Sequence, residues 1–244
     1  MFENRNTYRK SVDGKGLVSF KVTVKETDLL IHARENLQKK ATDIVIKYRR
    51  YIEAYIDMFP EFATTLAPWV HKHPAHEIIK KMSEAGKKAE VGPMASIAGA
   101  IAEYTGRELL LISDEVIIEN GGDTFINVKN SITIGIYAGS SPLSMKIGLK
   151  FDALENPFSV CTSSGTIGHS LSLGKSDAVC VVSDSALLAD AAATSIGNRV
   201  KSDHDINTAI DFGKNIEGVN GIVVVSGEKL GMWGNINIVK LKNT

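Results

Sequence analysis

The sequence has little cysteine, no net charge and no long apolar run. Its two cysteines, Cys161 and Cys180, form no C-x-x-C motif, and no histidine stands at zinc-ligand spacing from them. This pattern excludes a disulfide scaffold and a zinc finger, and we expect both thiols to be reduced in a cytoplasm. The 28 basic and 28 acidic side chains cancel, so the chain as a whole carries no electrostatic footprint for nucleic acid or for an anionic membrane.

Apolar segments are all shorter than the roughly 18 residues that a membrane-spanning helix needs. The first residues also lack the apolar core of a secretion signal and a lipid-attachment cysteine. We therefore expect a cytoplasmic protein with no membrane partner and no nucleic-acid partner. With 43% hydrophobic and 23% charged residues, 244 residues suffice to bury a core without disulfides or metal.

The first third of the chain predicts a hairpin followed by a long helix. Two runs rich in Val, Ile and Leu, at residues 17–24 and 28–32, flank a polar turn. From residue 34 to residue 59 apolar side chains recur at helical spacing, and a proline ends the pattern. Three histidines within residues 71–76 share no helical face and are interrupted by a proline. This favours a loop that enters a helix over a metal site.

The middle of the chain changes from helical to strand-like patterning. Short β-rich runs divided by Asp, Asn and Gly predict a meander-like antiparallel sheet. These runs are residues 109–113, 116–119, 124–128, 131–138 and 145–151. The remaining predicted elements are strands at 178–182, 221–225 and 235–241 and helices at 185–197 and about 205–214. Since no βαβ alternation is sustained, the sequence predicts an α+β fold and not a doubly wound one.

Asp190 is the most informative side chain for chemistry. On its predicted helix it shares a face with small and apolar residues and with Thr194, and not with other charges. A buried carboxylate needs a partner, and Thr194 places a hydroxyl on the same side one turn later. The pair suits a hard ion such as Mg²⁺, which completes its shell with water and substrate phosphates. The alternative is that Asp190 accepts backbone N–H bonds from a neighbouring loop.

Two glycine-containing stretches are candidate ligand-binding loops. The first combines hydroxyl side chains with a glycine, and its backbone amides can hold a phosphate or the edge of a flavin ring. It consists of Thr162, Ser163, Ser164 and Gly165, with His169 following. The second consists of Asn120, Gly121, Gly122 and Asp123. A plain strand connection is the alternative for both, and the sequence contains no G-x-S-x-G elbow and no phosphate loop of the G-x-x-x-x-G-K-[ST] type.

Taken in order, four segments between about residue 92 and residue 197 resemble the ApbE family of flavin transferases, enzymes that move FMN from FAD onto a protein threonine with Mg²⁺. ADAAAT at residues 189–194 resembles the family's A-D-A-x-A-T, whose Asp and Thr bind the metal. The Gly-Gly-Asp turn with ITIGIYAG after it, and TSSG with a following histidine, resemble further family segments. The resemblance implies that Asp190 and Thr194 bind Mg²⁺ and that Asp190 and His169 serve catalysis. It also implies contacts to FAD or FMN from Asn120, Gly121, Gly122, Asp123, Thr162, Ser163, Ser164 and Gly165.

The chain also departs from the family's pattern. In the segment resembling G-A-I-A-K-G-Y-A-V-D, Gly99 and Glu103 match the glycine and the acid, whereas Ala98 stands where the family has lysine. The family's D-P-x-x-G after the histidine is missing, and residues 1–90 show no M-G-T start. The chain is similar to a divergent cytoplasmic ApbE-like branch found in methanogenic archaea and some bacteria.

Several expectations follow from this resemblance. It implies an ApbE-like, T-fold-related core of mixed and antiparallel sheets packed with helices. One domain would span residues 1–244, with a divergent N-terminal hairpin and helix over about residues 1–90. The implied activity is that of an Mg²⁺-dependent transferase or hydrolase acting on the pyrophosphate of FAD or a related dinucleotide. The alternative, favoured by Ala98, is a non-catalytic flavin-binding or nucleotide-binding module. The expected partners are a dinucleotide or flavin and an acceptor protein, and a homo-oligomer stays open.

Overall fold

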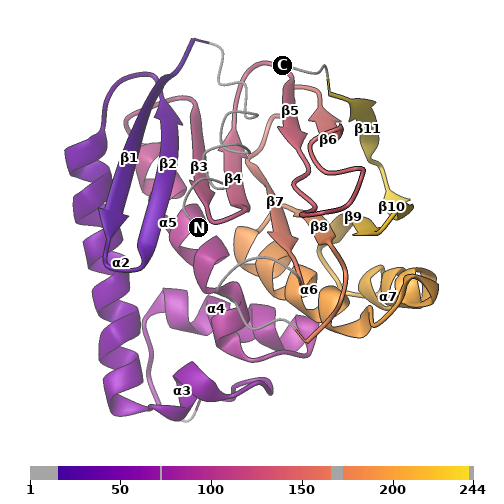
Figure 1. Cartoon of the computed structure of the whole chain (residues 1–244). Helices are drawn as coiled ribbons and strands as arrows, with labels where there is room; N and C mark the ends of the chain where they lie inside the picture. Colours follow the sequence, from indigo (N-terminus) through magenta and orange to yellow (C-terminus); the bar gives the residue numbers. More distant parts are fainter. Residues whose placement is uncertain (1–15, 72, 166–172, 242–244) are drawn as a thin grey trace.

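A large antiparallel sheet organises the chain (Figure 1). The computed structural model describes residues 16–71, 73–165 and 173–241. The eight strands of this sheet are β1 Val18–Val24, β2 Thr27–Ala33, β3 Val116–Asn120, β4 Asp123–Asn127, β7 Phe158–Ser163, β8 Ala178–Ser183, β9 Val219–Ser226 and β10 Lys229–Gly234. They lie in the order β1-β2-β3-β4-β7-β8-β9-β10, and every neighbouring pair is antiparallel. The predicted α+β class with an antiparallel sheet is confirmed.

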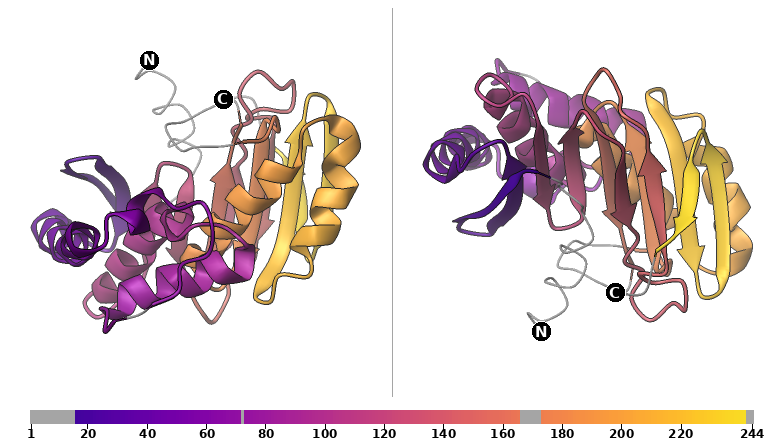
Figure 2. Two further views of the ribbon diagram at one scale, coloured as in Figure 1. Left: turned by 90° about the horizontal axis from the view of Figure 1, so that it is seen from below. Right: turned by 90° about the horizontal axis from the view of Figure 1, so that it is seen from above.

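Helices cover one face of this sheet (Figure 2). They are α2 Gln38–Met58, α3 Glu61–Thr64, α4 Glu77–Ala89, α5 Ile97–Leu109, α6 Ala186–Arg199 and α7 Ile206–Gly213, with single 3-10 turns η1 Pro93–Ser96 and η2 Asp203–Asp205. Helix α2 packs beside β1, α5 lies on β3 and β4, and α6 lies on β7 and β8. Within the described residues, no helix combines the length and the apolarity needed to cross a membrane.

A second, three-stranded sheet covers the opposite face. It consists of β5 Ile132–Gly135, β6 Ile147–Phe151 and β11 Asn237–Lys240, in the order β11-β6-β5. The large sheet therefore has a core on each side, and alternate residues of one strand enter different cores. On β8, Val181 packs under the helices while Cys180 and Val182 face the small sheet. Burial on both faces explains why this strand reads as a continuous apolar run.

Five of the predicted segments need correction. Residues 109–113, predicted as a strand, form the end of α5 and the turn after it, because a short apolar run does not by itself distinguish a helix end from a strand. The strands at 131–138 and 145–151 do not continue the meander but leave it for the small sheet. Residues 227–234, predicted as a connection, contain β10, which pairs with β9. The long helix begins at Gln38, four residues later than predicted.

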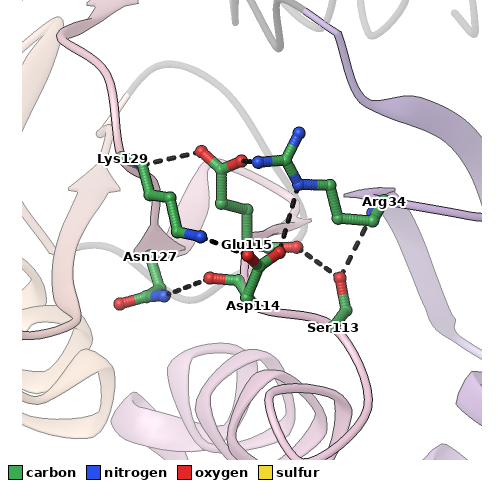
Figure 3. A network of polar contacts seen from close by, with 6 residues as sticks. All are labelled: Arg34, Ser113, Asp114, Glu115, Asn127 and Lys129. Atoms are coloured by element: carbon green, nitrogen blue, oxygen red, sulfur yellow. Dashed lines mark hydrogen bonds and ion pairs between the residues drawn. The ribbon is translucent and has the colours of Figure 1, made fainter.

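A polar network links the hairpin of β1 and β2 to the next strands of the large sheet (Figure 3). Arg34, directly after β2, binds Asp114 through Nε at 3.1 Å and forms an ion pair with the buried carboxylate of Glu115. The other oxygen of Glu115 accepts the backbone N–H of Lys129 at 2.7 Å, and Lys129 Nζ binds Asp114. The network links the end of β2, the start of β3 and the segment after β4. The hairpin is therefore held to the rest of the large sheet by ion pairs as well as by strand pairing.

Candidate functional site

Residues 120–123 form a tight two-residue turn between β3 and β4. Asn120 and Asp123 pair across the strands, and both intervening glycines have positive φ, +67° at Gly121 and +110° at Gly122. A turn of this primed kind demands glycine or a similar residue. The backbone N–H of Gly122 donates to Glu119 Oε1 at 3.0 Å, so this amide is used within the turn.

Strand alternation points Asn120 and Asp123 toward the helices, because they share their sides of β3 and β4 with Ile118 and Phe125 of the helix-side core. Asn120 Nδ2 donates to the carbonyl of Ala98, at the start of α5, at 3.0 Å. Asp123 is only 6% exposed, and its Oδ1 is buried without a hydrogen-bond partner among the described residues. An orphaned carboxylate oxygen marks a place where a cation or a donor is needed.

The carboxylate of Asp190 lies at the start of α5. Its Oδ2 accepts the backbone N–H of Gly99 at 2.9 Å, so the donor belongs to the first turn of a helix and not to the neighbouring loop that the sequence offered as an alternative. Gly99 has to be a glycine here, since a Cβ would lie 2.2 Å from the carbonyl oxygen of Ala186 and 3.0 Å from Asp190 Cβ. A negative charge at a helix N-terminus is stabilised by the unpaired amides of the first turn.

The two carboxyl groups influence each other. Burial raises the pKa of Asp123 to about 7, and the charge of Glu119 adds to the rise, while hydrogen bonds from Cys161 and from the backbone of Thr162 lower it. Burial also raises the pKa of Asp190 well above its ordinary value, the charge of Asp123 raises it further, and the amides of Gly99 and Ala98 oppose the shift. Charging both groups is therefore unfavourable unless positive charge is supplied.

The thiol of Cys161 completes this cluster. It is fully buried on β7, and its Sγ lies 3.4 Å from the carbonyl of Ala186. Burial raises the pKa of the Cys161 thiol well above its ordinary value, and the charges of Asp123 and Asp190 act in the same direction. The thiol therefore stays protonated beside the two carboxyl groups.

The stretch from residue 162 to residue 165 is divided between the two faces of the sheet. Thr162 turns its hydroxyl away from Asp190, toward Cys180 Sγ at 3.3 Å on the small-sheet side, although its backbone lies against Gly122. Ser163 lies on the helix side, next to Gly197 of α6. The N–H of Gly165 donates to the carbonyl of Ser176 at 3.0 Å, so this amide is used in holding the loop. Ser164 is partly exposed directly after β7.

Thr194 lies one turn after Asp190 on α6. Both residues are partly exposed, whereas residues 191–193 between them are buried, so they share the accessible side of the helix. His169 lies outside the described residues. In the part of the chain that the structure describes, no three His, Cys, Asp or Glu side chains form a cluster that could hold a metal by themselves. A metal here would rely on few protein ligands.

Sequence reasoning from spacing missed two members of this region. The sequence predicts only a reduced thiol at Cys161, although its place two residues after Ser159 and two residues before Ser163 puts it on the helix side of β7. For Glu103 the resemblance gives a match to a family acid and no structural role. It is buried on α5, and Oε2 accepts the N–H of Ala186 at 2.7 Å. An acid among the small residues of an otherwise apolar helix face is the signal that could have found it.

Comparison with known families then identifies the chain's relationships. A family model described as "AbpE bacteria" matches residues 9–225. The chain belongs to this family. Similar members include the UPF0280 proteins of Methanococcus aeolicus, 39% identical over 90% of this chain and 91% of that protein, and of Methanocaldococcus jannaschii, 40% identical over 88% and 90%. A third, from Methanocella arvoryzae, is 36% identical over 88% of both chains.

The solved structures that resemble this AbpE family member establish its fold. The flavinyl transferase ApbE of Pseudomonas stutzeri superposes with a TM-score of 0.56 and 12% identity, over 89% of this chain and 93% of that one. The flavin transferase ApbE of Vibrio cholerae gives a TM-score of 0.56 and 10% identity, over 89% and 96%. The chain therefore has the ApbE-like α+β fold that the sequence predicts.

Proposed function

We propose that this AbpE family member is an Mg²⁺-dependent transferase or hydrolase that acts on the pyrophosphate of FAD or a related dinucleotide, in the manner of an FMN transferase. The observation that supports the proposal most is the meeting of Asp123 and Asp190 on the helix side of the sheet. Neither carboxylate forms an ion pair with a lysine or arginine of the described residues. Two neighbouring acids without a cation are the setting in which a divalent metal binds.

The residues present fit Mg²⁺. Asp190 and Thr194 supply a carboxylate and a hydroxyl from one partly exposed side of α6, and the buried Oδ1 of Asp123 has no hydrogen-bond partner in the part of the chain that the structure describes. All three groups offer oxygen, the ligand atom that Mg²⁺ prefers, and the ion needs only one or two carboxylates because substrate phosphates complete its shell. Bound Mg²⁺ would neutralise charge on the pyrophosphate and polarise a phosphoryl oxygen.

The chain's own residues would orient the reacting groups. Asp190 is held at the first turn of α5 by the Gly99 amide, and Asn120 holds the adjacent Ala98 carbonyl. We assign the contacts to the flavin or nucleotide to residues 120–123 and 162–165. Because the amides of Gly122 and Gly165 are already used, side chains such as Ser163, and not these two amides, would contact the ligand. His169 or Asp190 would orient the hydroxyl nucleophile of an acceptor protein.

A non-catalytic flavin-binding or nucleotide-binding module is the second candidate, because Ala98 provides no cation at the position of the family lysine. Transfer of a phosphoryl-linked group depends on charge neutralisation, so loss of a lysine is a substantial departure. Both candidates share the site and the ligand class. We also propose a cytoplasmic location, since Cys161 and Cys180 are free thiols.

The deciding experiment incubates the purified protein with FAD and Mg²⁺. Chromatography should detect FMN and AMP, or mass spectrometry should detect FMN on a threonine of a partner protein. Asp190→Ala should abolish the products and weaken Mg²⁺ binding, measured calorimetrically with FAD present, by about tenfold or more, ~1.4 kcal/mol. Asp114→Ala, which removes an exposed acid of the network in Figure 3, is the matched control and should leave both unchanged.

The outcomes separate the candidates. Micromolar binding of FAD without any product supports the binding module. Failure to bind FMN or any dinucleotide, FAD included, contradicts both candidates. Unchanged Mg²⁺ affinity in a folded Asp190→Ala protein contradicts the metal role.

A further inference from the structure

Helices α5 and α6 cap each other's first turn. Asp190 of α6 accepts the N–H of Gly99 at the start of α5, and Glu103 of α5 accepts the N–H of Ala186 at the start of α6. Asp190 lies about one turn and Glu103 nearly two turns inside its own helix, and each accepts a first-turn amide of the other helix. The exchange couples the position of one carboxylate to that of the other.

Glu103 is held firmly in this arrangement. It is 6% exposed, and Oε2 accepts both the Ala186 N–H at 2.7 Å and the Ser185 hydroxyl at 3.1 Å. Oε1 accepts Nε of Arg107 at 2.8 Å. Both oxygens thus accept hydrogen bonds from protein donors and the side chain is buried, which gives Glu103 an internal role.

Ala186 connects Glu103 to the candidate site, because its backbone contacts both. Its carbonyl lies against Gly99 and within 3.4 Å of Cys161 Sγ, while its N–H binds Glu103. Asp190 follows four residues later, so it lies on the same side of α6 one turn further along. A shift of Ala186 by a few tenths of an ångström would move Asp190 by a similar amount, because a helix turn is rigid.

We propose that Glu103 is a positioning residue for the divalent-cation site, acting through the start of α6 on Asp190 and Thr194. The inference rests on the metal role in the proposed function and adds a residue to it that makes no contact with metal or substrate. What matters is the reach of the side chain, since the cap needs an acceptor atom at the position of Oε2. The negative charge is secondary, because the Ala186 amide is bound by an oxygen that an amide side chain also offers.

The test separates the effect of the negative charge of Glu103 from the effect of its side-chain length. Glu103→Gln keeps the acceptor and loses the charge, whereas Glu103→Asp keeps the charge and shortens the side chain by one methylene. Mn²⁺ binding to the full chain, followed by electron paramagnetic resonance with Mn²⁺ alone, should weaken by about tenfold or more in Glu103→Asp and by less than about threefold in Glu103→Gln. Arg107→Gln removes the ion pair with Glu103 Oε1 and the contact of the guanidinium with the Phe125 ring but leaves the bonds of Oε2, and it should bind Mn²⁺ like the wild type.

Each result has a definite meaning. Weakening in Glu103→Gln that equals or exceeds the weakening in Glu103→Asp would show that side-chain length does not decide the effect and would overturn the proposal, as would unchanged affinity in both while Asp190→Ala weakens. Unchanged affinity in Asp190→Ala, or no Mn²⁺ binding by the wild type, would instead remove the metal role itself. Circular dichroism checks folding. If Glu103→Asp does not fold, Ser185→Ala removes one donor to Oε2 and should give a smaller loss in the same direction.

Discussion

The side-chain amide of Asn120 donates a hydrogen bond of 3.0 Å to the backbone carbonyl of Ala98. This bond connects the end of β3, at the Gly-Gly turn, to the residue just before Gly99, whose amide binds Asp190. Ala98, which stands where the ApbE transferases that the sequence resembles have lysine, is therefore fixed through its backbone by a residue of the turn. The turn, the start of α5 and the start of α6 form one continuous set of contacts.

Asn120→Ala should destabilise the metal-free protein by about 1–2 kcal/mol, because the partly buried carbonyl of Ala98 loses its side-chain donor and the link between β3 and α5 is removed. Urea denaturation followed by circular dichroism measures the loss. Asn127→Ala is the matched control, since Asn127 makes an equally long bond to the Asp114 carbonyl in an exposed position. The control should change stability by less than about 0.5 kcal/mol. Equal effects in the two variants would contradict a special role for the Asn120 contact.

Asp123→Asn should stabilise the metal-free protein at pH 8 and should have little effect on its stability at pH 4. The pKa of Asp123 is raised to about 7 in the folded chain, so between pH 4 and pH 7 the unfolded state binds fewer protons than the folded one. Stability of the wild type therefore falls as pH rises through this window, by on the order of 4 kcal/mol. Thermal melting at both pH values measures the difference.

Asp114→Asn should change the stability at pH 8 in the opposite direction to Asp123→Asn. Hydrogen bonds from Lys129 and Arg34 lower the pKa of the exposed Asp114, so its charge stabilises the fold above its unfolded pKa and the contribution is lost as pH falls. Asp114→Asn should thus slightly lower the melting temperature at pH 8 and not at pH 3. If Asp123→Asn also lowers it at pH 8, the buried carboxylate is stabilising and our account of the pair is wrong.

Gly99→Ala should cost at least about 2 kcal/mol, because the added methyl overlaps the Ala186 carbonyl and overpacking outweighs the gain in helix propensity. Gly227→Ala is the control for conformational strain alone. Gly227 has φ +59° with open space around it, so its substitution should cost about 1 kcal/mol. Chemical denaturation of both variants checks the order, and a Gly99→Ala protein at least as stable as Gly227→Ala would show that α5 and α6 separate easily.

Ala98→Lys should raise the rate of FAD cleavage or FMN transfer several-fold if the protein is the proposed transferase or hydrolase. Ala98 is partly exposed, so a long side chain has room, and its ammonium group would supply the cation that transfer chemistry needs. Ala98→Gln, of similar length without charge, is the control and should have no such effect. Tighter FAD binding in Ala98→Lys with no product would favour the binding module.

Much of the fold follows from local sequence signals. The hairpin of β1 and β2, the periodic helix α2 and the small-residue helix α6 are read from runs of apolar residues and their spacing, which act over one or two turns. The elements that the sequence predicted wrongly are those whose place depends on tertiary packing. Whether residues 131–138 join the large sheet or the small one depends on which core buries them, and both cores accept an apolar strand.

For the site, the sequence by itself determined which residue types are available: the acid and hydroxyl of α6, the Gly-Gly turn and the alanine in place of lysine. The tertiary structure decided which of them meet. Strand parity brings Asp123 under the helices and sends the Thr162 hydroxyl to the other face, and the crossing of α5 over α6 exchanges Glu103 and Asp190 between helix starts. These pairings join residues up to 91 positions apart. No local pattern encodes them, because each depends on how whole elements pack.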